Sequence, residues 1–193
     1  MTETMEKIQA LIDSHQRAVQ DTFNECNYAI LHEIVRELLK AFKAGNKVIL
    51  CGNGGSAADS QHIAAEFVVR FHRERQSLPA IALSTDTSIL TATANDYDFS
   101  RVFARQVEGL GITGDVLIAL STSGNSANVV EAVKTAKTKG ILTIGFTNQD
   151  GGVLRQEVDI CFCAGSKDTP HVQEMHITAL HAISEVVESS LFA

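Results

Sequence analysis

The chain has 193 residues, of which 45% are hydrophobic and 20% charged, and its formal net charge is -7 at pH 7. This composition is typical of one globular domain, and no apolar run approaches the roughly 20 residues that a membrane-spanning helix needs. The negative charge argues against binding to nucleic acid or to an anionic membrane, and the N-terminus lacks the features of a secretion signal, so we expect a cytoplasmic protein.

Residues 1–45 predict two N-terminal helices. Apolar side chains recur at steps of three and four residues through 3–44, and Gly45 marks a stop. The outer helix carries Ile8, Leu11 and Ile12 in this pattern. We expect these side chains to pack on a partner subunit, because a bare monomer would leave them in water.

From residue 46 the pattern becomes strand, loop and helix in repetition. Strands are expected at 47–52, 79–84, 115–120, 141–147 and 158–163. Helices are expected at 57–71, 87–94, 99–109, 127–139 and 171–190. The connections are long enough for crossovers, which predicts an α/β fold with a doubly wound, five-stranded parallel sheet. We expect residues 1–193 to form one domain with its ligand beyond the carboxyl ends of the strands.

A glycine-rich loop, residues 52–56, follows the first strand. Its glycines permit a tight turn, and Ser56 is a good N-cap for the next helix. His62 and Glu66 are four residues apart, so they share one face of that helix, close to a loop that could hold an anion. The loop also matches a dinucleotide fingerprint, but the next suitable acid, Asp86, lies about 30 residues on instead of about 20, which disfavours that alternative.

A hydroxyl-rich loop, residues 121–126, follows the third strand and precedes a helix. A phosphate there could accept hydrogen bonds from hydroxyl and backbone N–H groups at the favourable end of the helix dipole. In the alternative interpretation Ser126 merely caps the helix. A capping turn uses one or two hydroxyls and this loop has four, which favours phosphate binding.

The C-terminal helix carries Gln173, His176 and His181 as polar candidates, with Pro170 suited to its first turn. A lone histidine on an apolar helix is usually a core residue, which is our interpretation of His176. Gln173 and His181 are eight residues apart, about 12 Å of helical rise, so they can share one ion only if it lies between them.

Three of the four cysteines lie in strand-like runs, and the alternation of residues 161–163 puts two sulfurs on one face. We interpret these cysteines as reduced core thiols, with a metal or redox role as the alternative.

Seven segments, in this order and spacing, resemble the phosphoheptose isomerase family. They cover essentially the whole chain: residues 52–59, Gln61 and His62 with Glu66, residues 83–90, 94–97, 103–107, 121–126 and 173–176. The resemblance implies the SIS (sugar isomerase) fold, in which helices flank a five-stranded parallel sheet. It also implies a homotetramer with active sites between subunits.

The resemblance implies an aldose-ketose isomerase that converts sedoheptulose 7-phosphate into D-glycero-D-manno-heptose 7-phosphate, the first step toward the ADP-heptose of lipopolysaccharide. A proton moves between C1 and C2 through an enediol, which requires a base, an acid and stabilisation of charge on oxygen. By resemblance Glu66 is the base, His181 is the acid, and one Zn²⁺ per subunit polarises the oxygens. A carboxylate bound to zinc is a poorer base, so either Glu66 leaves the metal during turnover or the ion has a lesser role.

The resemblance also implies which residues bind the zinc ion, the phosphate and the rest of the substrate. The zinc ligands are His62, Glu66, Gln173 and His181. The phosphate is held by Ser121, Thr122, Ser123 and Ser126. Further substrate contacts are Asn53, Gly54, Ser56, Arg70, Asp96 and Gln173.

The chain departs from the family pattern at two positions. His171 stands where the family commonly has Arg or Lys, so substrate affinity depends on pH if that cation binds substrate. Asp98 stands where Gly is frequent.

The main alternative is a non-catalytic tetramer of the same fold that binds the replication initiator. Such proteins tend to lack a glutamate at the position of Glu66 and a histidine at the position of His181. The presence of both residues in this chain favours the isomerase. A phosphosugar-sensing regulator is disfavoured, because residues 1–45 leave little room for a DNA-binding domain and contain no basic recognition helix.

Overall fold

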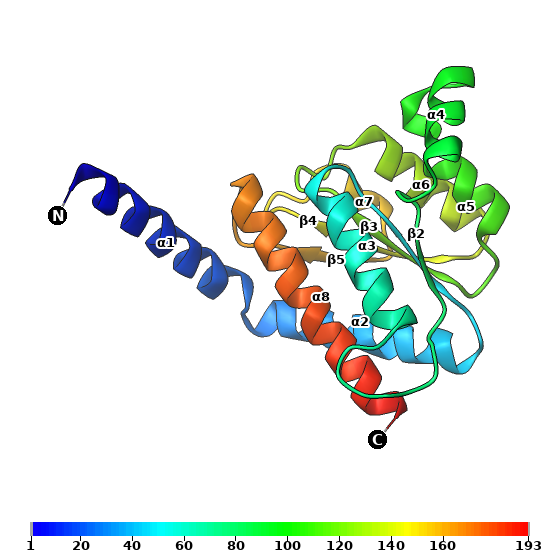
Figure 1. The fold of residues 1–193 in the computed structure, drawn as a ribbon, viewed down its shortest axis with the longest axis horizontal. Helices are drawn as coiled ribbons and strands as arrows, with labels where there is room; N and C mark the ends of the chain where they lie inside the picture. The colour runs from blue at the N-terminus through cyan, green and yellow to red at the C-terminus, as the bar shows by residue number, and fades with distance from the viewer. Residues whose placement is uncertain (1, 193) are drawn as a thin grey trace.

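The computed structural model describes residues 2–192 and contains a five-stranded sheet with helices on both faces (Figure 1). The strands are β1 Val48–Cys51, β2 Ala80–Ala82, β3 Val116–Leu120, β4 Leu142–Thr147 and β5 Ile160–Cys163. Their order across the sheet is β2-β1-β3-β4-β5, and all neighbouring pairs are parallel. The predicted doubly wound parallel sheet is therefore confirmed.

The helices follow the predicted order with two differences. They are α1 Glu3–Thr22, α2 Glu25–Lys43, α3 Gly55–Val68, α4 Thr87–Asp96, the 3₁₀ helix η1 Phe99–Arg101, α5 Ala104–Leu110, α6 Ala127–Thr138, α7 Leu154–Glu157 and α8 Thr169–Leu191. The single helix expected at 99–109 is divided into η1 and α5, because the chain bends to bury Val102 and Phe103 between them. Helix α7 was not predicted, since four residues are too few to show a helical period.

Alternate residues of each inner strand face opposite helical layers. In β1, Val48 and Leu50 pack with α2, α3 and α8, whereas Ile49 and Cys51 pack with α5 and α6. This is the period of two that a strand imposes on its side chains. Because both faces are covered, all four residues of β1 are buried. The expected alternation at β5 is also confirmed, since the Cys161 and Cys163 sulfurs lie 3.7 Å apart on one face.

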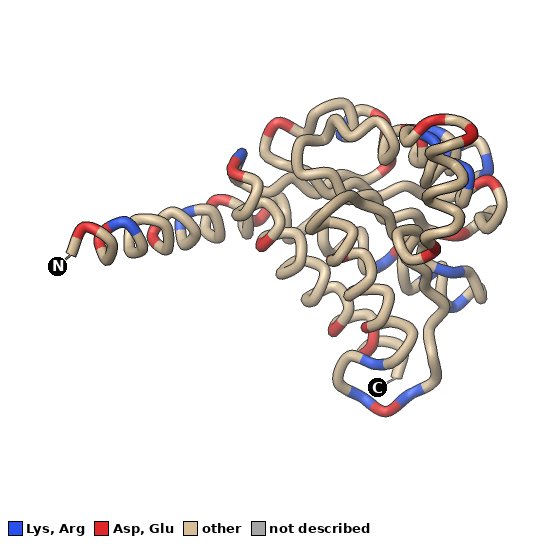
Figure 2. The backbone as a smooth tube through the Cα atoms, turned by 45° about the horizontal axis from the view of Figure 1, so that its top comes forward, with Lys and Arg blue, Asp and Glu red and all other residues tan. Residues whose placement is uncertain are grey.

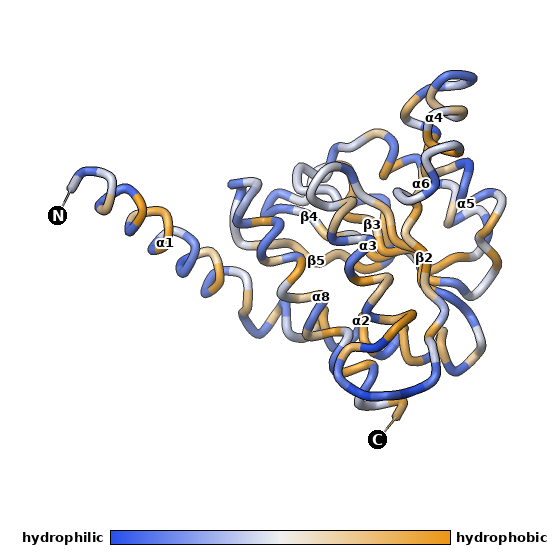
Figure 3. Tube along the Cα trace, in the orientation of Figure 1, coloured by the Kyte–Doolittle hydropathy of each residue, from blue (hydrophilic) through white to orange (hydrophobic). Residues whose placement is uncertain are grey.

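Helix α1 projects from the rest of the molecule (Figure 1). Basic residues lie beside acidic ones along it (Figure 2), and hydrophobic residues alternate with hydrophilic ones (Figure 3). Its only buried residues are Ala18 and Thr22, near its C-terminal end, whereas Ile8, Leu11 and Ile12 are between 54% and 64% exposed. The packing of this face on a partner subunit stays a prediction. Among residues 2–192, no helix has both the length and the hydrophobicity required to span a membrane.

Candidate functional site

The two predicted ligand loops are neighbours because β1 and β3 are paired in parallel, so both loops leave the sheet at the same edge. A reciprocal pair of hydrogen bonds joins them. The Asn53 side-chain amide donates to Asn128 at 2.9 Å, and the Asn128 amide donates back to Asn53 at 2.8 Å. Asn53 in the first loop is therefore fixed against the start of α6, directly after the second loop.

The first loop turns sharply at Gly54, whose φ of 54° lies in the left-handed region that favours glycine. Helix α3 begins at Gly55, and the Gly54 carbonyl accepts hydrogen bonds from the N–H groups of Ala57 and Ala58 at 3.1 and 3.2 Å. The prediction that Ser56 is the N-cap is therefore wrong. Gly54 takes that position, and Ser56 lies in the first turn, where its residue surface is only 3% exposed.

Two hydroxyls of the second loop, those of Ser121 and Ser126, lie next to each other. Ser126 is the N-cap residue of α6 but its side chain makes no capping hydrogen bond. Its Oγ lies 2.9 Å from Ser121 Oγ instead. The interpretation of Ser126 as a simple cap is not supported, and its hydroxyl remains directed toward the loop interior.

The segment before α7 holds this second loop in place. Gly124 has a φ of 69°, and its carbonyl accepts a hydrogen bond of 2.8 Å from Leu154 N–H. The Asn125 side-chain oxygen accepts another of 3.1 Å from Val153 N–H. A side chain at Gly124 would collide with the Gly151 carbonyl, so the loop is tightly packed.

A cluster of two histidines and a glutamate is formed between α3 and α8. His62 Nε2 lies 3.3 Å from Glu66 Oε1 and 2.8 Å from His181 Nε2. One ligand atom of each residue lies within 4.8 Å of the other two, so the cluster could hold a metal ion. Burial lowers the pKa of His181, and the nearby His62 lowers it further while Glu66 opposes the change. Two imidazoles and one carboxylate are a donor set that zinc accepts.

Gln173 lies at the loop end of α3. A Cβ at Gly55 would be 2.4 Å from Gln173 Nε2, so the amide packs on the backbone of the glycine loop. Helices α3 and α8 thus run side by side in the same direction, with Gln173 beside Gly55 and His181 beside His62. A role of Gln173 as ligand of the same ion stays a prediction.

Arg70 and Asp96 lie at the surface. Arg70 follows α3, has a side chain 56% exposed and lies 3.8 Å from Glu74. Asp96 ends α4, accepts a hydrogen bond of 2.7 Å from Asn95 and lines a cavity with Tyr97 and Arg105. Within the described part of the chain, no hydrogen bond or ion pair connects Arg70 or Asp96 to the loops or to the His/Glu cluster.

The other two histidines of α8 are buried. His176 is fully buried and its Nε2 lies 3.1 Å from the Thr147 carbonyl, which confirms its interpretation as a core residue. Burial lowers its pKa to about 4, so it is neutral at physiological pH. His171 is 8% exposed and faces Ser14 of α1, not the two loops.

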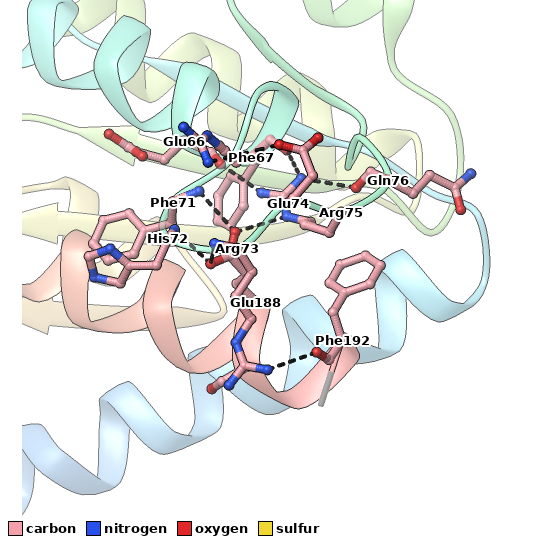
Figure 4. Close-up of polar contacts among 12 residues, drawn as sticks. Glu66, Phe67, Phe71, His72, Arg73, Glu74, Arg75, Gln76, Glu188 and Phe192 are labelled. Atoms are coloured by element: carbon pink, nitrogen blue, oxygen red, sulfur yellow. Dashed lines mark hydrogen bonds and ion pairs between the residues drawn. The ribbon is translucent and has the colours of Figure 1, made fainter.

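A buried ion pair behind the site was not predicted from the sequence (Figure 4). Glu188 of α8 accepts hydrogen bonds of 2.8 to 2.9 Å from three successive N–H groups, at residues 71–73, and one of 3.0 Å from Arg75 Nε. The Arg75 guanidinium also donates to the carbonyls of Phe67 and Glu66 at 2.7 and 2.8 Å. The backbone of Glu66 is therefore anchored to α8 through Arg75.

Asp59, one turn before His62 on α3, was also not predicted from the sequence as a functional residue. Its Oδ2 is buried without a hydrogen-bond partner in the described structure, and burial raises its pKa. A buried carboxyl group beside a polar cluster is typical of functional sites. Its place in the segment 52–59 was visible in the sequence, but its burial was not.

Comparison with known protein sequences finds matching domain-family models and similar proteins of a single family. A SIS domain family model matches residues 12–148, and a second SIS domain model matches residues 111–191. A phosphoheptose isomerase of Roseiflexus sp. (strain RS-1) is 52% identical over 188 residues, which are 97% of this chain and 93% of that protein. The phosphoheptose isomerase of Thermodesulfovibrio yellowstonii is 47% identical over 190 residues, 98% of this chain and 94% of that protein.

Solved structures give the same family. The phosphoheptose isomerase of Neisseria gonorrhoeae superposes with a TM-score of 0.91 at 39% identity, covering 96% of this chain and 99% of that one. The enzyme of Francisella tularensis superposes with a TM-score of 0.93 at 32% identity, covering 98% and 100%.

Proposed function

Because the chain belongs to the phosphoheptose isomerases, a family of SIS-domain enzymes, we propose that it converts sedoheptulose 7-phosphate into D-glycero-D-manno-heptose 7-phosphate. The observation that carries the proposal is the meeting of His62 and Glu66 of α3, the helix that follows the glycine-rich loop, with His181 of α8. The product is a precursor of the ADP-heptose of lipopolysaccharide, and we place the enzyme in the cytoplasm.

Glu66 and His181 divide the proton transfers between them. Glu66 removes a proton from C1 of the ketose and returns it to C2, while His181 moves the proton between the two oxygens through an enediol. The side chain of Glu66 is 20% exposed, which leaves it open to a substrate yet partly shielded from water. Arg75 supports this arrangement, since it holds the Glu66 carbonyl in place.

The donor set of the cluster fits Zn²⁺, and we assign His62, Glu66 and His181 as its ligands with Gln173 as the fourth. A bound zinc ion supplies polarisation of the substrate oxygens. Because a carboxylate held by a cation is a poorer base, Glu66 acts as base only when it is free of the ion.

The hydroxyl-rich loop binds the phosphate, through Ser121, Thr122, Ser123 and Ser126. Support comes from the Ser126 hydroxyl, which makes no capping hydrogen bond to α6 and lies 2.9 Å from the Ser121 hydroxyl instead. The loop also precedes the 12-residue helix α6, whose N-terminal dipole favours an anion. Asn53, Gly54, Ser56 and Gln173 contact the sugar from the first loop and the adjacent end of α8.

Arg70 and Asp96 complete the site from another subunit of a homotetramer. Both side chains are at the surface, where a neighbouring chain can reach them. The exposed apolar residues of α1 provide a face for such an assembly.

Incubation of the purified protein with sedoheptulose 7-phosphate, followed by NMR, tests the proposal. Samples with and without added Zn²⁺ are compared side by side. We expect the aldose signals to increase with time. A folded protein that forms no aldose under either condition contradicts the proposal and favours the non-catalytic alternative. The Glu66→Gln variant provides the inactive control.

A further inference from the structure

A second group of metal-ligating side chains lies outside the proposed active site. His15 of α1 meets His171 and Glu174 of α8, with one ligand atom of each residue within 4.8 Å of the other two. His171 is ten residues before His181, about 15 Å away along the helix, so the two clusters are separate. The second group connects α8 to α1, the helix that projects from the molecule (Figure 1).

The distances within this group leave one nitrogen without a partner. His15 Nδ1 lies 2.6 Å from Glu174 Oε2, whereas His171 Nδ1 lies 3.6 Å from the same oxygen, which is too long for a hydrogen bond. His171 is only 8% exposed, and its Nδ1 is buried without a hydrogen-bond partner among residues 2–192. A buried polar atom of this kind is costly unless something pairs with it.

His171 can carry its proton on the other nitrogen, Nε2. That atom lies 3.2 Å from Ser14 Oγ, which can accept a hydrogen bond from it, and 3.7 Å from the Asp168 carboxylate. The Nδ1 lone pair then faces the Glu174 carboxylate with no proton between them. A cation between the two atoms removes this repulsion, and the Nε2 contact with Ser14 has the form of an outer hydrogen bond that orients a metal-binding histidine.

We propose that His15, His171 and Glu174 bind a divalent cation of the zinc class. Zinc bonds of about 2.0 to 2.1 Å in a tetrahedron separate neighbouring ligands by about 3.4 Å, close to the 3.6 Å between His171 Nδ1 and Glu174 Oε2. His15 must withdraw slightly from Glu174, and its side chain is 34% exposed, which leaves room to do so. Two imidazoles favour zinc and its neighbours over magnesium or calcium.

The consequence is a cross-link between α1 and α8. Within one chain, Ala18 and Thr22 are the only buried residues of α1, so few contacts with the rest of the same chain fix the angle at which the helix projects. A cation at His15 adds an anchor one turn further toward the N-terminus. The role of this site is structural, and it does not depend on the proposed isomerase activity.

Zinc binding by a chain whose first cluster is disabled tests the proposal directly. In the full-length His62→Ala/His181→Ala variant, equilibrium dialysis against ZnCl₂ followed by elemental analysis is expected to give one zinc per chain. Adding His15→Ala should weaken zinc binding at least about tenfold, because even the loss of an outer-shell partner of a metal ligand lowers metal affinity by that factor. Adding His32→Ala, which changes an exposed histidine of α2, should leave it unchanged.

Hydrogen exchange gives a second readout in the otherwise wild-type chain. Zinc is expected to slow amide exchange around residues 11–18 of α1, and His15→Ala should abolish this effect while His32→Ala preserves it. No bound zinc in the double variant, or equal zinc binding with and without His15, overturns the proposal. Either outcome leaves the isomerase assay unaffected, because that assay concerns the other cluster.

Discussion

Two histidines of the same helix differ because of what surrounds each side chain. His176 is fully buried against the Thr147 carbonyl and has a pKa of about 4, so it stays neutral and packs in the core. His181, five residues later, faces His62 and Glu66 at the surface of α3. Residue type and helical position alone did not distinguish them, whereas burial and the neighbouring helix do.

At the same scale, Glu66→Gln tests the proposed base. Gln keeps the size of the side chain but cannot accept the proton, so we expect kcat to fall by about 10² to 10⁴ with no change in thermal stability. Turnover of sedoheptulose 7-phosphate and the melting temperature are measured on the same preparation. The control is Glu185→Gln, an exposed glutamate of α8, which should keep full activity. A Glu66→Gln variant as active as the control contradicts the assignment.

Ser121→Ala tests the phosphate loop. The Ser121 residue surface is 2% exposed and its hydroxyl pairs with Ser126, so the substitution removes one hydroxyl without disturbing the surface. Loss of a hydrogen bond to a charged group costs about 1.5 to 3 kcal/mol, which corresponds to roughly a tenfold to hundredfold higher KM. Ser190→Ala at the exposed end of α8 is the matched control. An unchanged KM places the phosphate elsewhere.

At the scale of elements, the end of α3 is held by a segment that returns to α8. Burial alone would raise the pKa of Glu188, but N–H groups of His72, Phe71 and Arg73 and the Arg75 guanidinium lower it to about 2. A folded pKa below the unfolded value means that Glu188 contributes stability above about pH 4.5. This contribution is lost as the pH falls from about 4.5 toward 2.

Glu188→Gln tests this link between α3 and α8. At pH 7 we expect the free energy of unfolding to fall by roughly 1 to 3 kcal/mol, allowing for solvent screening near the chain end. Between pH 4.5 and 2 the difference from the wild type should shrink, since protonation removes the same charge. Urea unfolding at a series of pH values measures this difference in the free energy of unfolding, with Glu185→Gln as the control. A pH-independent difference would show that the charge is not responsible.

The elements also show where sequence analysis succeeds. Strands β1 and β3 were predictable because both faces are buried, which makes each an unbroken apolar run. The start of α3 was misplaced because Gly54 adopts a left-handed φ and takes the N-cap position before Ser56 can. The Glu188 network was missed because its partners lie more than 110 residues earlier in the chain, and only the fold brings them together.

At the scale of the whole molecule, local sequence patterns predicted the fold and one half of the candidate site. The way in which subunits assemble cannot be predicted from the pattern of a single chain. His62 and Glu66 share a helix face by spacing alone, but their meeting with His181 required the parallel packing of α3 and α8. Arg70 and Asp96 make no hydrogen bond or ion pair with this cluster in the described chain, and the apolar face of α1 is uncovered. These three features share one explanation if a second subunit completes each site.

Leu11→Glu tests that explanation. Leu11 is 64% exposed on α1, so the monomer fold tolerates the change, but a charge at an apolar subunit contact is costly. We expect size-exclusion chromatography with light scattering to give the wild type the mass of the proposed tetramer and the variant a lower mass, with an activity that falls in proportion. Gln9→Glu adds the same charge at an exposed polar position of α1 and should preserve both mass and activity. If Leu11→Glu keeps the tetramer, α1 is not its contact; if it yields fully active monomers, each site belongs to a single chain, and Arg70 and Asp96 have no role across subunits.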